Sequence, residues 1–137
     1  MDIVSRLVIG IMTVTLLMAN GYTMQDVDLL SQVIYHENWH TDAEKKTAYW
    51  TGAVVMNRVK SDKFPNTIHD VLYQRGQYST TKKFFTKEIP KECYEMARKI
   101  LAYGTPDVPK NVLFQSQQPK LGRGHWKVLN GEYFAYG

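Results

Sequence analysis

The chain has 137 residues, a length typical of one domain, and its 44% hydrophobic and 22% charged residues exclude a disordered chain. Lys and Arg outnumber Asp and Glu by 17 to 13, which gives a net charge of +4. These basic residues form no dense run, so we expect no nucleic-acid partner. A mild positive excess favours approach to an anionic wall or membrane, and it is equally typical of an ordinary solvated surface.

The first 22 residues differ from the rest of the chain. Arg6 precedes an apolar run of thirteen residues, 7–19, which stops before Asn20. This length suits a signal peptide and is shorter than the ~20 residues of a transmembrane helix. The context for cleavage after residue 19 is poor, because Leu17 stands where a small residue is expected. Residues 1–22 are therefore predicted to be a signal peptide or an uncleaved membrane anchor; a helix of the domain itself is the alternative.

The first helix of the domain is predicted to begin near Thr23 and to end near Glu37. Thr23 with Asp26 in the first turn is typical of a helix N-terminus, and apolar residues continue at helical spacing. Glu37 lies four residues after Val33 and so shares the buried stripe. A carboxyl at the end of an apolar face is costly to ionise, which suits a general acid. A Glu that fixes neighbouring backbone amides is the alternative.

A second helix is predicted over residues 42–60. It follows a capping box at residues 41–44, and it must end before Pro65, because the residue preceding a proline is pushed out of α geometry. A short helix then begins at residue 66 or 67 and ends at Tyr73.

The last helix is predicted to open at Pro90 and to end at Gly104. Its apolar face includes Cys93, the single cysteine of the chain. A single cysteine excludes an intrachain disulfide, and this position predicts a buried, inert thiol.

The C-terminal part of the chain reads as β structure. Residues 111–116 are predicted to form a strand. Residues 125–129 and 132–136 flank Asn130-Gly131, the strongest short signal for a β-hairpin. The predicted fold class is therefore α+β, with about four helices packed on a small antiparallel sheet near the C-terminus.

The middle of the chain carries three blocks in order, Asn57-Arg58-Val59, Phe64-Pro65-Asn66-Thr67 and residues 71–79, which read V-L-Y-Q-R-G-Q-Y-S. They resemble the signature N-R-V, F-P-N-T and V-x-Y-Q-x-x-Q-F/Y-S of cell-wall hydrolases related to the catalytic domain of spore cortex-lytic enzymes. The resemblance covers residues 27–137. It implies a lysozyme-like, lytic-transglycosylase-like domain over residues 23–137 that cleaves the MurNAc-GlcNAc strands of peptidoglycan.

The same resemblance implies roles for individual residues. Glu37 matches the catalytic glutamate, which lies roughly twenty residues upstream of the N-R-V block, and Gln77, Tyr78 and Ser79 match a loop of the cleft. A single acid suffices for a lytic transglycosylase, in which the C6 hydroxyl of muramic acid replaces water as the nucleophile. Gln115 and Trp126 are candidates for a surface that supports the sugar rings of the substrate. For Trp126, ordinary packing in the hairpin is the alternative.

One position departs from the family pattern. Its members close with I-G-x-H-x-F, whereas residues 129–134 read L-N-G-E-Y-F, so Glu132 stands in place of the histidine. Either that histidine is structural and replaceable, or Glu132 is a second carboxylate and the product is hydrolytic.

A rival motif includes the same glutamate. Residues 36–40 read H-E-x-x-H, the pattern in which two histidines one helical turn apart bind zinc. That arrangement needs one continuous helix through His40, whereas the capping box at 41–44 indicates a new helix, and no third ligand is evident. A zinc metallopeptidase or amidase using His36 and His40 remains the alternative enzyme, and an inactive wall-binding protein the alternative without activity. The leading interpretation needs no cofactor and no metal.

These interpretations place the protein outside the cytoplasmic membrane, secreted or anchored and facing the cell wall. Gly10, Thr13 and Thr15 weaken the apolar run, as in phage endolysins whose anchor can later leave the bilayer, so a phage or a bacterial origin fits. We expect a monomer that acts on peptidoglycan glycan strands, with its N-terminal segment in contact with the membrane.

Overall fold

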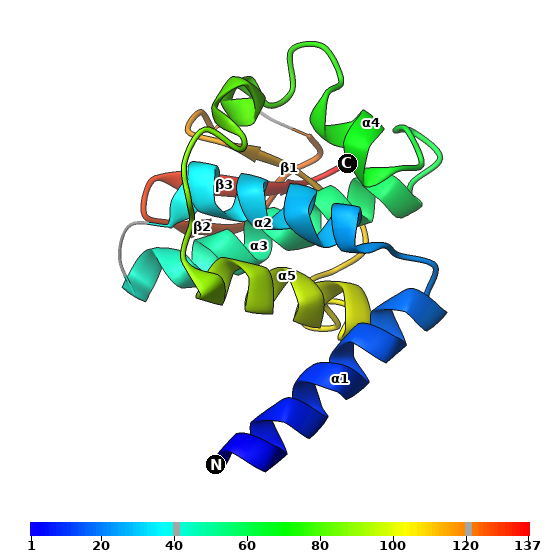
Figure 1. The fold of residues 1–137 in the computed structure, drawn as a ribbon. Helices are drawn as coiled ribbons and strands as arrows, with labels where there is room; N and C mark the ends of the chain where they lie inside the picture. Colours follow the sequence, from blue (N-terminus) through cyan, green and yellow to red (C-terminus); the bar gives the residue numbers. More distant parts are fainter. Residues whose placement is uncertain (40–41, 120–121) are drawn as a thin grey trace.

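The computed structural model describes residues 1–39, 42–119 and 122–137. Its elements in chain order are α1 (Ile3–Ala19), α2 (Met24–Asn38), α3 (Asp42–Lys60), α4 (Ile68–Leu72), the 3₁₀ helix η1 (Ser79–Lys83), α5 (Lys91–Tyr103), β1 (Val112–Ser116), β2 (His125–Leu129) and β3 (Glu132–Tyr136). The α+β class, with a small antiparallel sheet near the C-terminus, is confirmed (Figure 1). The 3₁₀ helix η1 was not predicted from the sequence, whereas the other helices and strands from α2 onward were.

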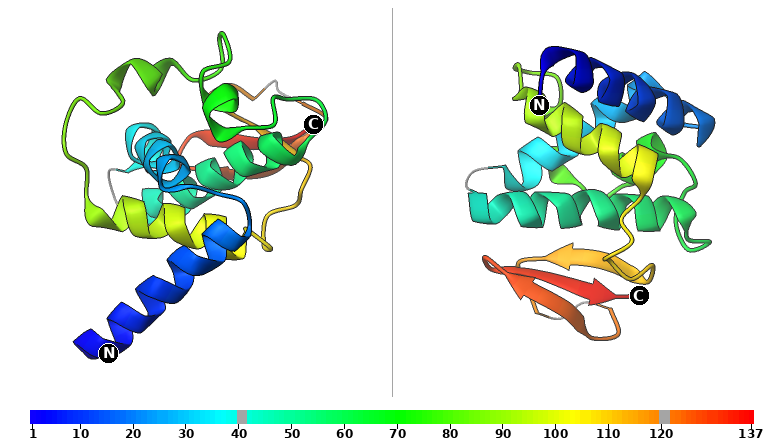
Figure 2. Two further views of the ribbon diagram at one scale, coloured as in Figure 1. Left: turned by 45° about the vertical axis from the view of Figure 1, so that its right-hand side comes forward. Right: turned by 90° about the horizontal axis from the view of Figure 1, so that it is seen from below.

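α3 is the central layer of the domain. The sheet lies on one side of it, and α2 and α5 lie on the other (Figure 2). Gly52 permits the close approach on the helical side, because a Cβ there would lie 2.6 Å from Cδ1 of Ile100. Ala53, by contrast, packs in the cluster that contains Trp50 and Phe134 and so faces the sheet. One residue along a helix turns the side chain by about 100°, which separates these neighbours.

The helix ends follow local chemistry. At the start of α2, Oγ1 of Thr23 accepts from the backbone N–H of Asp26, and the Asp26 carboxylate accepts from the backbone N–H of Thr23, which forms a capping box. At the start of α4, Oγ1 of Thr67, one of the two residues predicted to begin this helix, accepts from the backbone N–H of Asp70. Pro90 is the N-cap of α5 and so lies one position before the first turn. The capping residue expected at Thr41 lies outside the described residues.

The sheet has the order β1-β3-β2, and both pairs are antiparallel. The β2–β3 hairpin turns at Asn130 and Gly131, whose φ values of 52° and 77° are those of the turn predicted from the Asn-Gly pair. Phe134 packs on Trp50 of α3, with ring centroids 5.2 Å apart. Alternate residues of a strand share a face, so Glu132 lies on the same side of the sheet, toward the helices.

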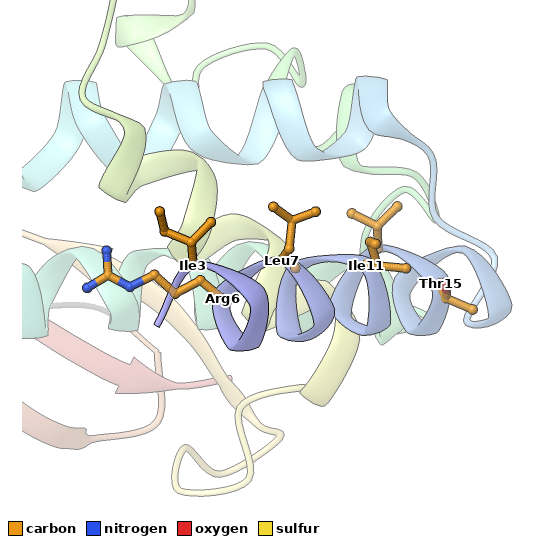
Figure 3. Close-up of a pocket in the computed structure, with 7 residues that line it drawn as sticks. Ile3, Arg6, Leu7, Ile11 and Thr15 are labelled. Atoms are coloured by element: carbon orange, nitrogen blue, oxygen red, sulfur yellow. The ribbon is translucent and has the colours of Figure 1, made fainter. Parts of the chain in front are cut away.

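The N-terminal segment forms α1, which lies against α5 (Figure 1). Thr13 and Leu17 are buried, and Nδ2 of Asn20 donates to the backbone oxygens of Leu101 and Ala102 at the end of α5. The other large apolar residues of α1 are mostly exposed, and Ile3, Leu7 and Ile11 project from one side of the helix (Figure 3).

No single helix of the described residues is long and apolar enough to cross a membrane. α1 and α2 would qualify only as a pair, by length and composition, and they are bent by 104° relative to each other.

Candidate active site

The C-terminal end of α2 opens on a cleft of about 590 Å³ whose other walls are the loop before η1 and the strands β1 and β3. The residues that line it are Glu37, Arg58, Gly76, Gln77, Tyr78, Ser79, Phe114, Gln115, Ser116, Gln117 and Glu132. The cleft therefore brings together all the site residues proposed from the sequence except Trp126. The proposed site residues in the cleft come from four separate segments of the chain.

Glu37 is half-buried in the last turn of α2. Its Oε1 accepts a hydrogen bond of 2.8 Å from Oγ1 of Thr80 in η1. Burial raises the pKa of the Glu37 carboxyl, and the negative charge of Glu132 acts in the same direction; the bond from Thr80 and the positive charge of Lys83 oppose them. The net direction is upward, so the protonated form persists to a higher pH than in an exposed glutamate. This state can donate a proton to a bound substrate.

Glu132 begins β3 and is half-buried at the edge of the same cleft. Its place follows from strand alternation, since Phe134 two residues later anchors this face of β3 on α3. Glu37 and Glu132 line the same cleft, and the negative charge of Glu132 raises the pKa of the Glu37 carboxyl. The cleft thus contains a pair of acidic side chains, one in a helix and one in the sheet.

Arg58 was not predicted as a site residue, yet it forms part of the cleft wall. It is only 4% exposed, and its Nε donates to the backbone oxygen of Leu113 at 2.8 Å. The guanidinium carbon lies 4.7, 5.4 and 5.7 Å from the ring centroids of Phe64, Tyr78 and Phe114. Aromatic faces attract a cation, which offsets part of the cost of its burial.

Within the described part of the chain, Arg58 has no carboxylate partner. Its remaining contact is a hydrogen bond of 3.0 Å from Nη1 to Oε1 of Gln77. A sequence signal for this residue existed: Arg58 follows Val54 by four positions and so falls on the buried stripe of the helix. A charged side chain on such a stripe is buried, so neighbouring groups must offset the cost of removing its charge from water.

The remaining cleft residues differ in exposure. Gln77 and Ser79 are exposed, and Tyr78 is half-buried under the guanidinium of Arg58. Burial raises the pKa of Tyr78, partly against the positive charge of Arg58, so its hydroxyl is neutral at ordinary pH. Oε1 of Gln115 is buried and has no hydrogen-bond partner among the described residues. Leaving a buried acceptor unpaired costs about 1–3 kcal/mol.

Trp126 does not line the cleft. Its ring packs edge-on against Trp50, with centroids 5.0 Å apart, on the side of the sheet that faces α3. Trp126 therefore packs in the hairpin, which was the alternative given for it in the sequence analysis.

The H-E-x-x-H motif lies across the end of a helix. α2 ends at Asn38, and Trp39 has φ −115° and ψ 61°, outside helical geometry; His40 lies outside the described residues. The ring of His36 stacks on Phe84, with centroids 5.7 Å apart. Burial lowers the pKa of His36, and the positive charges of Lys87 and Lys83 add to this. In residues 1–39, 42–119 and 122–137, no group of three His, Cys, Asp or Glu side chains is placed to hold a metal ion.

Residues 42–130 match the family model described as Cell Wall Hydrolase. The match covers well over half of the chain. It contains Arg58 and the loop from Gln77 to Ser79, and it begins beyond Glu37. Comparison with curated proteins and with solved structures gives no match.

Proposed function

The chain belongs to the cell wall hydrolase family, and we propose that it cleaves peptidoglycan glycan strands between MurNAc and GlcNAc, with Glu37 as general acid and base. The observation that carries this proposal is the position of Glu37: a half-buried carboxyl with a raised pKa, open to a cleft large enough for sugar rings. An acid of this kind gives a proton to a leaving oxygen more readily than an exposed, ionised carboxylate.

The proposed reaction is that of a lytic transglycosylase. Glu37 protonates the glycosidic oxygen, the bond from that oxygen to the anomeric carbon breaks, and positive charge develops on the ring. The ionised Glu37 then accepts the proton of the muramic acid C6 hydroxyl while its oxygen attacks the anomeric carbon. The product is a 1,6-anhydro ring, and the acid is restored. The intramolecular hydroxyl is favoured over water by proximity.

Purified cell walls provide the test of this role. Wild-type protein should clear a wall suspension, and Glu37→Gln should clear it at least ~10²-fold more slowly, because general acid–base catalysis contributes about that much. Equal clearing by both proteins would remove Glu37 from the mechanism. If the wild type binds the walls but does not clear them, the protein is an inactive wall-binding protein instead.

Hydrolysis is the second candidate, and the presence of Glu132 in the same cleft as Glu37 favours it. A second carboxylate can act as a base that activates water, or as a nucleophile that attacks the anomeric carbon. Digestion in water labelled with heavy oxygen separates the two reactions. A transglycosylase leaves the new muramic acid ends unlabelled, whereas hydrolysis labels them and should be abolished by Glu132→Gln.

The zinc alternative is weaker, because α2 ends before residue 40. A chelator should leave wall clearing unchanged. Loss of activity with a chelator and its recovery with zinc would favour a metallopeptidase or amidase over glycan cleavage.

Residues 23–137 are proposed as the catalytic domain of a monomer, and residues 1–22 as the export signal or anchor that places it on the wall side of the membrane. The exposed apolar side chains of α1 support this assignment. It also fits a phage endolysin or a spore cortex-lytic enzyme. Mass spectrometry of the N-terminus, from membrane and soluble fractions, tests it; full-length protein found only in the cytosol would contradict it.

A further inference from the structure

A second hollow, of about 630 Å³, lies at the C-terminal end of α3 and shares no lining residue with the cleft. Its walls include the end of α3, the segment that follows α5 and the start of β1. Neighbouring residues of the chain divide between the two sites: Asn57 and Leu113 line the hollow, whereas Arg58 and Phe114 line the cleft. The two sites therefore flank the contact between α3 and β1.

The hollow is positively charged. Three exposed lysines line it, Lys60, Lys63 and Lys110, and no carboxylate side chain does. Within the described part of the chain, none of the three forms an ion pair with a carboxylate. Of the acids adjacent to them in the chain or on the same loop, Asp62 lies outside the lining, and Asp107 accepts a hydrogen bond from a tyrosine hydroxyl. The hollow therefore suits an anionic ligand.

Asn57 adds an oriented hydrogen-bond acceptor. This residue is only 8% exposed, and its Nδ2 donates to the backbone oxygens of Pro109 at 2.9 Å and Val112 at 3.0 Å. Because both bonds use the amide nitrogen, Oδ1 points away from these carbonyls. Among the described residues Oδ1 has no donor, and it is not one of the fully enclosed atoms without a partner. It is therefore accessible, at a residue that lines the hollow, and can accept an N–H from a ligand.

We propose that this hollow binds the peptide stem of peptidoglycan, with the three lysines paired to its free carboxylates and Asn57 Oδ1 accepting from one of its amide N–H groups. Val108 and Leu113, both buried in the wall of the hollow, suit the methyl groups of alanine in the stem. A phosphate-linked wall polymer has the charge but no amide N–H in its backbone, so the peptide matches better. This inference rests on the proposed action on peptidoglycan and does not depend on which bond is cleaved.

The test measures binding of a synthetic stem tetrapeptide to the full-length protein by calorimetry at low ionic strength. Its amines are acetylated, so that the carboxylates are its only charges. The same peptide with amidated carboxyls should bind about tenfold more weakly or worse, because charge-assisted hydrogen bonds are lost. A set of analogues replaces each amide in turn with an ester. At least one ester should bind about fivefold more weakly, since it cannot donate to Asn57.

Three variants locate the binding. Lys60→Gln combined with Lys110→Gln should weaken binding of the charged peptide about tenfold or more. Its Tm should stay that of wild type, because both side chains are exposed. The matched control is Lys91→Gln, the same change at an exposed residue of α5 outside the hollow, which should bind as wild type does. Glu37→Gln should also bind the peptide normally, because Glu37 lines the cleft and not the hollow.

The proposal is overturned if charged and amidated peptides bind equally, if every ester binds as the amide does, or if the double lysine variant keeps wild-type affinity. Loss of binding in Glu37→Gln would place the peptide in the cleft and overturn it as well. Poly(glycerol phosphate) that competes with the peptide at equal affinity would identify a general anion site and overturn the assignment to the stem. New glycan ends judge the proposed function separately: if they form without peptide binding, it stands, and if they are absent, it fails whether or not the peptide binds.

Discussion

Oγ1 of Thr80 donates a hydrogen bond of 2.8 Å to Oε1 of Glu37, across 43 positions of the chain. The bond joins η1 to the last turn of α2, and the residues immediately before Thr80 form one wall of the cleft. It favours the ionised carboxyl, whereas burial and the charge of Glu132 favour the protonated one. An acid that must first give and then take a proton depends on this balance.

Removing the hydroxyl at residue 80 should shift that balance. Thr80→Val leaves the carboxyl without its donor, so the pKa of Glu37 should rise further and the alkaline limb of the activity profile should move to higher pH. Thr80→Ser keeps the hydroxyl and should retain the wild-type profile. Rates of wall clearing measured across pH give both limbs. An identical profile in Thr80→Val would mean that the bond does not form when substrate is bound.

Charges around Glu37 should shift its titration in opposite directions. Glu132→Gln removes a negative charge that raises the Glu37 pKa, so the alkaline limb of the remaining activity should move to lower pH. Lys83→Gln removes a positive charge that lowers this pKa, so the limb should move to higher pH. Both variants are compared at one low ionic strength, since salt screens such effects. Shifts of the same sign would contradict the arrangement of charges.

Glu37→Gln should make the protein more stable at neutral pH while it removes activity. The folded-state pKa of Glu37 is raised, so the folded protein binds its proton more tightly than the unfolded chain does. The stability from this group is therefore fully present at low pH and is lost as pH rises from the ordinary to the raised pKa. Glutamine does not titrate, so the gain in Tm over wild type should grow across that window. A gain that is constant with pH would contradict the shift.

Much of the fold could be predicted from local signals. Helix caps such as Thr23 and Thr67, the break at Pro65 and the Asn130-Gly131 turn each act within a few residues, so the sequence alone contains the information. Glu37 was likewise identified from its place on an apolar stripe. These features require no knowledge of how distant segments meet.

The composition of the cleft could be predicted only in part. Thr80 reaches Glu37 through a contact between distant segments, and nothing in its neighbourhood distinguishes it from Thr81. Arg58 is buried because three aromatic rings from separate segments surround it. The helical period places Arg58 on the core face, but the rings that make its burial tolerable come from the tertiary fold.

The attachment of α1 to the domain can be tested with two leucines of the same helix. Leu17 is fully buried in the main core cluster, and Leu7 is 59% exposed. Leu17→Ala should lower the free energy of unfolding by about 2–5 kcal/mol, the usual cost of a cavity. Leu7→Ala should change it by less than about 0.5 kcal/mol, as exposed positions do. Urea denaturation of the full-length chain measures both, and equal effects would show that Leu17 is not packed in solution.

The most direct test of glycan cleavage by Glu37 is end-group analysis of digested peptidoglycan. Purified strands are incubated with wild type and with Glu37→Gln, and the new muramic acid ends are identified by mass spectrometry. We predict 1,6-anhydro ends with the wild type and almost none with the variant. Free peptide stems on uncut glycan strands would contradict the account, because they would show cleavage of an amide and not of the glycosidic bond.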